Sequence, residues 1–257
     1  MPTYEPPKVD VPALTALLDG HYGEIRQMVR KNLAEYAGVL DDAIEMPRDG
    51  RHRIGIALDE WGVWHPEARP WGPNAELSRD PVTYEQANTL RDALAAGVAF
   101  EGFHRQCNVL TLANLAQIVN VLQSVAMTDG PRMWLTPTYH ALRLHAPHIG
   151  ATALPVAVEA GARLPDGSSA VSATASRGEA GLAVTLINRH YSEAASIRIA
   201  GVAGQASGQI LTADSPAAQN SLEAPDRVAP AALEVARDGD SWLVALPPHS
   251  LATIVIQ

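Results

Sequence analysis

The spacing of apolar residues predicts three helices and two strands in the first 148 residues. Where apolar residues recur at every third or fourth position, one face of a helix is expected to be buried and the other exposed to water. Where they form a short unbroken run, a strand covered on both faces is expected. The predicted elements are, in chain order, a helix over 22–46, a strand over 54–58, a helix over about 83–103, a strand over 109–117 and a helix over 136–145.

Proline-rich segments separate some of these elements. Residues 1–12 contain four prolines and little apolar pattern, which predicts an irregular N-terminal arm. Residues 65–81 are also rich in proline, so a long loop is expected there, and Thr83 or Asp80 is the predicted cap of the next helix. Trp71 in this loop could line a binding subsite, or it could hold the loop against the rest of the fold.

The pattern changes after residue 150, where short apolar runs alternate with Gly, Pro, Asp and Ser. This texture predicts an antiparallel β-sandwich over residues 149–257, separate from an α/β part over residues 13–148. Trp242 falls in an alternating strand and is expected in the sandwich core. The predicted strands cover 154–158, 182–187, 197–199, 209–211, 232–235, 242–246 and 252–256.

Two adjacent carboxylates follow the first predicted strand and precede two tryptophans. Neighbouring strand residues point to opposite sides, so only Asp59 or Glu60 can face a pocket while the other hydrogen-bonds within the wall. Glu60, flanked by Trp61 and Trp64, is the better candidate, because indole faces bind the C–H side of a sugar and a carboxylate there can attack an oxocarbenium-like centre. The alternative is that the acids merely end a structural strand in solvent.

The stretch Asp-Glu-Trp-Gly-Val-Trp at 59–64 resembles the Asp-Glu-Trp-Asn-Val-Trp signature of family 51 glycoside hydrolases, the α-L-arabinofuranosidases. The resemblance implies that Glu60 is the catalytic nucleophile. It also implies that Trp64 and Gln117 position the sugar at the rim of a barrel, with Asp59 and Trp61 in supporting roles. Further stretches resemble the same family in the same order: 88–94, 103–108, 113–120, 212–214, 220–221, 225–228 and 246–250.

The resemblance implies a fold that is α/β plus all-β. A sector of a (β/α)8 TIM barrel, made of its last strands and helices, would be followed by a C-terminal, jelly-roll-like antiparallel β-sandwich. Two positions depart from the signature, because Gly62 stands where asparagine is usual and His65 where tyrosine is common. Gly62 removes an amide that could hydrogen-bond near the nucleophile.

A retaining glycosidase needs a second carboxylic acid roughly 5 Å from the nucleophile to protonate the leaving oxygen and then activate water. In family 51 this acid is a glutamate that follows an asparagine upstream of the nucleophile. The sequence contains no Asn-Glu pair. We therefore expect the chain to correspond to the C-terminal half of the enzyme, beginning near the sixth barrel helix and lacking the acid/base.

Composition narrows the partners and the location. The 257 residues carry a formal charge of −9, which argues against nucleic acid or an anionic membrane as the partner. One cysteine, Cys107, excludes an internal disulfide framework. The sequence shows no leader and no apolar run near 18 residues, so a cytoplasmic location is expected unless a missing N-terminal half carries a leader.

No cofactor is expected, and a metal site is disfavoured. His140, His145 and His148 are close in sequence, but their spacing places them on no single helix face and no acid or cysteine cluster joins them. The expected ligand is an arabinofuranosyl-containing saccharide, and the expected partner is a complementary barrel half or further copies of the chain.

Two functions remain at this point. The first is a retaining α-L-arabinofuranosidase that releases terminal arabinofuranosyl units and here lacks the half with the acid/base. The second is a non-catalytic carbohydrate-binding or assembly module with a degenerate barrel remnant.

Overall fold

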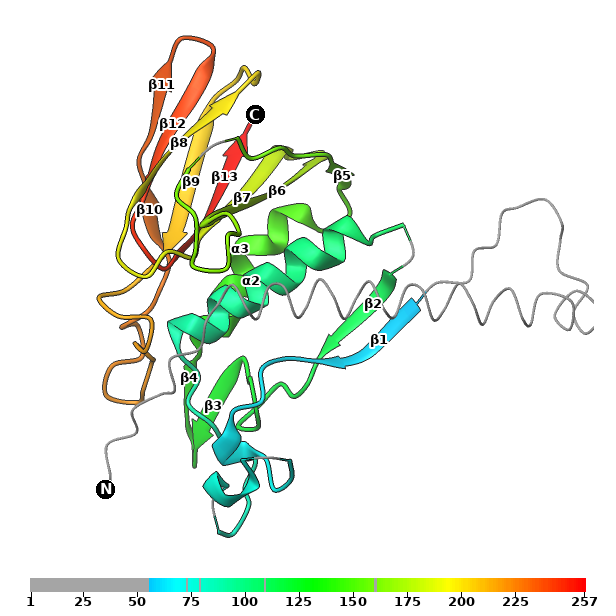
Figure 1. The fold of residues 1–257 in the computed structure, drawn as a ribbon, viewed down its shortest axis with the longest axis vertical. Helices are drawn as coiled ribbons and strands as arrows, with labels where there is room; N and C mark the ends of the chain where they lie inside the picture. The colour runs from blue at the N-terminus through cyan, green and yellow to red at the C-terminus, as the bar shows by residue number, and fades with distance from the viewer. Residues whose placement is uncertain (1–55, 73, 79, 109, 160) are drawn as a thin grey trace, which may run out of the picture.

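The described part of the molecule is mostly β-strand, with helices α2 and α3 near its centre. Figure 1 shows four layers, namely a three-stranded sheet, a six-stranded sheet, the helices and a two-stranded sheet. The arm predicted over 1–12 and the helix predicted over 22–46 lie outside the described part of the chain. This computed structural model describes residues 56–72, 74–78, 80–108, 110–159 and 161–257.

A β–α–β unit carries the candidate residues. Strand β1 (Ile56–Trp61) pairs in parallel with strand β2 (Leu110–Leu115), and helix α2 (Leu90–Arg105) lies between them in the chain. The helix begins after Thr89, which forms a capping box with Asp92, so the prediction that Thr83 or Asp80 caps it is wrong. The apolar spacing predicted a helix over about 83–103; the observed helix begins seven residues later and ends two residues later.

Helix α2 is buried on nearly every side because it separates two packed layers. Leu58 of β1 and Phe103 of the helix belong to one cluster on the side of the two-stranded sheet. Leu94 of the helix packs with Ile187 and Leu251 of the six-stranded sheet on the other side. Most of its side chains are therefore buried, and the apolar ones pack on both layers.

Short elements connect this unit to the rest of the chain. The loop after β1 contains two 3-10 turns, η1 (Pro66–Ala68) and η2 (Ala75–Leu77). A hairpin that the sequence pattern missed, β3 (Ala126–Asp129) with β4 (Arg132–Leu135), follows β2. Helix α3 (Pro137–His145), predicted over 136–145, comes next; Thr136 is its N-cap, and the helix leads into η3 (Ala146–His148).

The C-terminal part consists of two antiparallel sheets packed face to face. The six-stranded sheet has the order β10-β9-β13-β7-β6-β5 and the three-stranded sheet has the order β11-β12-β8. Their strands are β5 (Thr152–Leu154), β6 (Val171–Gly178), β7 (Gly181–Asn188), β8 (Ala195–Ala200), β9 (Ala206–Leu211), β10 (Ala231–Leu233), β11 (Val235–Asp238), β12 (Ser241–Leu246) and β13 (Ser250–Ile256).

The six-stranded sheet is covered on both faces, which explains its unbroken apolar strands. Leu186 and Ile254 pack against the three-stranded sheet, where Trp242 is 8% exposed, and the core position predicted for Trp242 is confirmed. Ile187, which follows Leu186 in β7, and Leu251 of the adjacent strand β13 face the helices instead. Strands β7 and β13 therefore lack the polar alternation of a sheet with one wet face.

Two strand predictions in this part need correction, and one strand was missed. The run 232–235 was expected to be one strand, but it divides between β10 and β11, which belong to different sheets. Strand β6 was not predicted, because its Ser, Ala and Thr residues form no apolar run. The run 154–158 contributes only its first residue to a strand, at the end of β5.

The strand β1 is not buried on both faces as its apolar run suggested. Ala57, Asp59 and Glu60 are exposed, because α2 covers only one face of the β1–β2 pair among the described residues.

In the part of the chain that the structure describes, no helix is long and apolar enough to cross a membrane.

Candidate active site

The candidate site lies at the carboxyl ends of β1 and β2. Because the strands are parallel, the residues that follow them meet at the same end of the sheet. Trp61 pairs with Leu115, so Glu60, Trp64 and Gln117 all lie near this end. The parallel pairing thus brings together the segments that carry the three predicted site residues.

A bulge in β1 changes the direction of its acidic side chains. Leu58 pairs with Ala113 and Trp61 with Leu115, so β1 carries one extra residue between these pairs. Leu58 and Trp61 both pack toward α2. An extra residue breaks the alternation of side chains, and bulges are common beside active sites for this reason.

Both carboxylates are exposed, which differs from the prediction of one acid in the pocket and one in the wall. Among the described residues, none donates a hydrogen bond to Asp59 or Glu60, so the expected hydrogen bond within the wall is absent there. The alternation rule failed here because of the bulge. The exposed side chain of Glu60 is therefore accessible to a ligand.

Trp61 supports the strand end by packing. Its ring meets Phe100 and Phe103 of α2 edge to face, with centroid distances of 5.4 and 5.2 Å. Its indole nitrogen is buried and has no hydrogen-bond partner among the described residues. Trp61 therefore anchors the strand to the helix rather than offering a face to a sugar.

Trp64 belongs to a group of three aromatic rings at the rim. Its ring packs edge to face on Trp71 at 5.3 Å, and Trp71 lies 6.4 Å from Tyr84. Trp71 is 49% exposed and Tyr84 39% exposed. Such partly exposed rings offer flat apolar surface of the kind that binds sugars.

Gly62 has a backbone reason to be glycine. Its φ is +142°, a conformation that residues with a side chain rarely adopt. A Cβ there would also lie 3.4 Å from the carbonyl oxygen of Ala116 and from Oε1 of Gln123. The departure from the family signature at this position therefore fits the local path of the chain.

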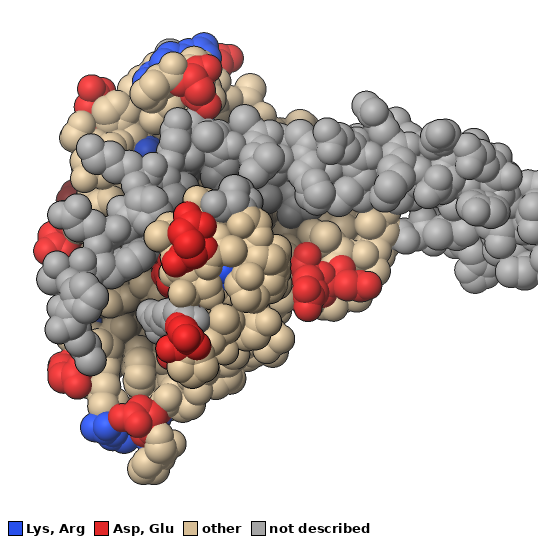
Figure 2. Space-filling model, turned by 60° about the horizontal axis from the view of Figure 1, so that its bottom comes forward, with Lys and Arg blue, Asp and Glu red and all other residues tan. Residues whose placement is uncertain are grey.

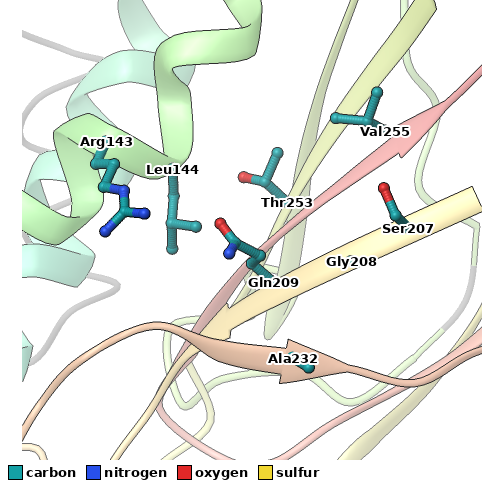
Figure 3. A pocket seen from close by; sticks show the side chains of 8 residues that line it. All are labelled: Arg143, Leu144, Ser207, Gly208, Gln209, Ala232, Thr253 and Val255. Atoms are coloured by element: carbon teal, nitrogen blue, oxygen red, sulfur yellow. The ribbon is translucent and has the colours of Figure 1, made fainter.

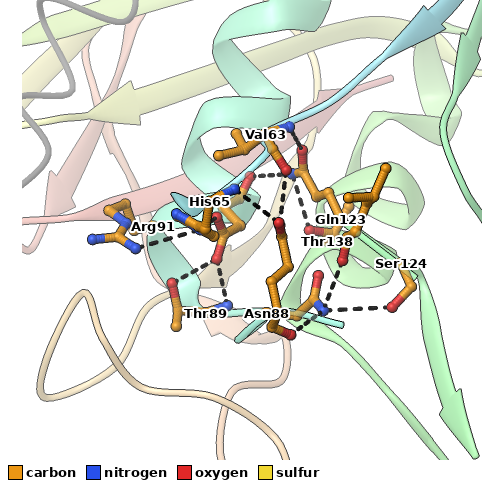
Figure 4. A network of polar contacts seen from close by, with 11 residues as sticks. Val63, His65, Asn88, Thr89, Arg91, Gln123, Ser124 and Thr138 are labelled. Carbon is orange, nitrogen blue, oxygen red and sulfur yellow. Dashed lines mark hydrogen bonds and ion pairs between the residues drawn. The ribbon is translucent and has the colours of Figure 1, made fainter. Parts of the chain in front are cut away.

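Two buried glutamines, which the sequence pattern did not single out, hold the backbone around Trp64. The amide N–H of Val63 donates to Oε1 of Gln123 at 2.7 Å (Figure 4). Nε2 of Gln86 donates to the carbonyl of Val63 at 2.8 Å, and its Oε1 accepts from the N–H of His65 at 2.9 Å. The only sequence signal that Gln123 is buried was its position next to the apolar Leu122.

His65 takes part in a buried charged group below the rim. Its Nε2 lies 2.7 Å from Oδ1 of Asp92 and 3.4 Å from Arg91. Burial favours a higher pKa for Asp92, but the hydrogen bond and charge of His65, the Thr89 amide and the Arg91 charge hold that pKa below its usual value. Asp92 is therefore a buried carboxylate anion.

Gln117 is exposed and directly follows a cis peptide bond with Ala116. The N–H of Ala116 donates to the carbonyl of Trp61 at 3.0 Å, which ties the residue before Gln117 to the end of β1. The side chain of Gln117 has no hydrogen-bond partner among the described residues. Its amide is available to a ligand.

The histidines that raised a metal interpretation lie away from the rim. His148 is hydrogen-bonded through both ring nitrogens, to Ser176 at 2.7 Å and to Thr185 at 2.8 Å. Nδ1 of His145 lies 2.8 Å from the carbonyl of Ala141. Within the described ranges, no group of three or more His, Cys, Asp or Glu residues could hold a metal ion.

A separate pocket of about 380 Å³ lies between α3 and the six-stranded sheet (Figure 3). Arg143 and Leu144 of α3 line it from one side, and residues of β9, β10 and β13 line it from the other. None of the predicted site residues contributes to it.

On the face drawn in Figure 2, the described residues show scattered acidic groups and no continuous basic patch.

An exposed carboxylate, partly exposed indole rings and an exposed amide, on segments that reach one end of a strand pair, are the kinds of group that glycoside hydrolases use. The family model of the α-L-arabinofuranosidase C-terminal domain matches residues 59–250. An intracellular exo-α-L-arabinofuranosidase of Bacteroides ovatus is 38% identical over 221 residues. The chain therefore belongs to the α-L-arabinofuranosidase family, glycoside hydrolase family 51, and matches its C-terminal region.

Solved structures agree with this assignment. The GH51 arabinofuranosidase from Xanthomonas axonopodis pv. citri is 32% identical, with a TM-score of 0.73 over 97% of this chain and 48% of that one. The thermostable GH51 α-L-arabinofuranosidase from Thermotoga petrophila has a TM-score of 0.75 at 22% identity, which shows the shared fold. The B. ovatus match covers 81% of this chain and 41% of that protein, so the chain spans under half of that relative.

Proposed function

We propose that this chain is the nucleophile-bearing part of a retaining α-L-arabinofuranosidase. The observation that carries the proposal is the place of Glu60, exposed at the carboxyl end of β1, with Trp64 and Gln117 on segments that reach the same end. The named relatives are arabinofuranosidases, which supports a terminal arabinofuranosyl unit as the substrate. Polysaccharides or oligosaccharides with such units are the proposed substrate class.

In the proposed reaction, an Oε atom of Glu60 attacks the anomeric carbon and the bond to the leaving oxygen breaks. A glycosyl ester on Glu60 forms, and water then hydrolyses it. Trp64 and Gln117 hold the sugar, while Asp59 and Trp61 support the strand end. The acid that protonates the leaving oxygen would come from outside these 257 residues, since the sequence holds no Asn-Glu pair.

The β1–α2–β2 unit supports a second part of the proposal, that residues 13–148 form the last sector of a (β/α)8 barrel and residues 149–257 a separate sandwich domain. Among the described residues, β1 and β2 pair only with each other, so each leaves a free edge. Free edges of this kind pair readily with other strands. A complementary barrel half, or another copy of the chain, is the proposed partner, and a cytoplasmic location stays a prediction.

The test uses an aryl arabinofuranoside whose phenolate leaves without a proton. The purified chain is mixed with it, and the release of phenolate and the mass of the chain are followed. An active nucleophile gives a burst of phenolate and an arabinosyl adduct on the peptide that contains Glu60, with slow turnover because no base activates water. Glu60→Gln should abolish both signals, while Glu76→Gln, an exposed loop acid, should keep them.

The competing function is a non-catalytic carbohydrate-binding or assembly module. It is favoured by the fact that the described residues hold no carboxylate partner for Glu60. Saccharide binding without any adduct on Glu60, both for the chain alone and for the chain mixed with a complementary half, would support this function and contradict the enzymatic one.

A further inference from the structure

The backbone on either side of Trp64 is held by side chains rather than by a sheet or helix. Residues 62–65 belong to no regular element, yet three backbone groups flanking Trp64 have buried side-chain partners. Gln123 accepts from the N–H of Val63, while Gln86 donates to the carbonyl of Val63 and accepts from the N–H of His65. We call Gln86 and Gln123 the amide clamp.

Both glutamines are themselves fixed. Gln123 is 0% exposed and Gln86 is 4% exposed, so neither has freedom to leave its partners. Nε2 of Gln123 donates to the carbonyl of Asp92 at 2.6 Å and lies 3.2 Å from Oγ1 of Thr138. The clamp therefore ties the segment 63–65 to the first turns of α2 and α3.

Each amide of the clamp uses both its oxygen and its nitrogen. A carboxamide has an acceptor oxygen and two donor hydrogens, and Gln86 uses both kinds of group on the two residues that flank Trp64. Rotation of the backbone at Trp64 would break these bonds in a buried setting, where an unpaired group is costly. The direction of the Trp64 side chain is thereby restricted.

We propose that Gln86 and Gln123 are positioning residues that fix the Trp64 indole in the orientation used to bind the sugar. This proposal rests on the proposed function for its ligand, but not for the orientation itself. Trp71 packs on the edge of Trp64 at 5.3 Å, so the clamp also holds the inner end of the aromatic group formed by Trp64, Trp71 and Tyr84.

The experiment labels the five tryptophans of the full chain with 5-fluorotryptophan and records 19F NMR spectra, each resonance being assigned by a Trp→Phe substitution. Gln86→Met and Gln123→Met keep the side-chain volume and remove the hydrogen bonds. The Trp64 resonance should shift and broaden, and that of Trp71 should follow, while Trp242 in the sandwich core stays unchanged. Gln209→Met, on an exposed site of β9, is the matched control.

Sugar binding gives the second readout, with an arabinofuranosyl disaccharide as the probe. The clamp variants should bind it about tenfold more weakly, because small displacements of a positioning group have effects of this size or larger. Gln86→Glu keeps the acceptor for His65 but sets a second oxygen against the carbonyl of Val63 in a buried position, so it should lose at least as much affinity as Gln86→Met. Gln123→Met alone serves if Gln86→Met does not fold.

The outcomes separate the clamp from the proposed function. An unchanged Trp64 resonance, equal shifts of all five tryptophans, or unchanged sugar affinity in a variant whose Trp64 resonance moves would each overturn the positioning role. If Trp64 alone moves with Trp71 but the unmodified chain binds no sugar, the orientation by the clamp stands and the proposed function fails.

Discussion

At the scale of single residues, Asp92 shows how a buried charge is kept in place near the rim. Its two carboxylate oxygens accept from Nε2 of His65, from the N–H of Thr89 and from the hydroxyl of Thr89. The same residue caps α2 and fixes His65, which follows Trp64. The departure of His65 from the family signature therefore belongs to a complete hydrogen-bonded group and not to an isolated substitution.

Replacing Asp92 with asparagine tests this group. The amide keeps the shape but presents a donor where the carboxylate accepted one, so a buried donor loses its partner. We expect Asp92→Asn to lower the free energy of unfolding by about 1–3 kcal/mol. Urea unfolding followed by circular dichroism measures the change.

Asp240→Asn, at an exposed turn, is the control and should change the free energy of unfolding by less than about 0.5 kcal/mol. Equal effects of the two substitutions would show that the contacts of Asp92 with His65 and Thr89 do not stabilise the fold.

At the scale of elements, most helices and strands followed from local pattern, and the exceptions have physical reasons. Strands β7, β12 and β13 were predictable because their apolar runs end at clear turn residues, and helix α3 because Pro147 closes the segment 136–145. Strand β6 was not, since its small residues gain their burial only from partners distant in sequence. The amide clamp has the same origin, because Gln123 meets Val63 across 60 positions of the chain.

Helix α2 offers a prediction at this scale. A Cβ at Gly97 would lie 2.5 Å from Cδ1 of Leu251 and 2.9 Å from Cδ1 of Ile187, both fully buried. Alanine in a helix interior normally stabilises by about 1 kcal/mol relative to glycine. Here the overpacking penalty of about 1–3 kcal/mol should outweigh that gain, so Gly97→Ala should lower the free energy of unfolding.

The control for Gly97→Ala is a second substitution that makes room. Leu251→Ala removes the atom nearest to the new methyl group, so the double variant should be less destabilised than the sum of the two single variants. If the changes in the free energy of unfolding of the two single variants simply add, the new methyl group does not press on Leu251. The helix would then have moved away from the sheet, contrary to the close packing of α2.

At the scale of the whole molecule, three histidines lie where the helices meet the six-stranded sheet. The rings of His104 and His148 are 4.9 Å apart, and those of His145 and His148 are 5.9 Å apart. Burial is the main cause that lowers the pKa of His145 to about 3 and that of His148 to about 4. The pKa of His104 is lowered by burial as well.

These lowered pKa values predict that the molecule loses stability in mild acid. The unfolded chain binds protons at these histidines near pH 6.5, whereas the folded protein does not until the pH is much lower. Their neutral forms therefore stabilise the fold fully above about pH 6.5, and this contribution falls as the pH decreases toward about 4. Each such proton changes the free energy of unfolding by about 1.4 kcal/mol per pH unit.

Urea unfolding at several pH values between about 4.5 and 7.5 measures this slope. His145→Gln and His148→Gln should each flatten it by about one proton, even where they lower the stability at neutral pH, because glutamine does not titrate. Gln209→Met, at an exposed position of β9 that carries no titrating group before or after the substitution, should leave the slope unchanged. If the slope stays the same in all three variants, other groups cause the loss of stability in acid. The histidines between the helices and the six-stranded sheet would then not determine how the whole fold responds to pH.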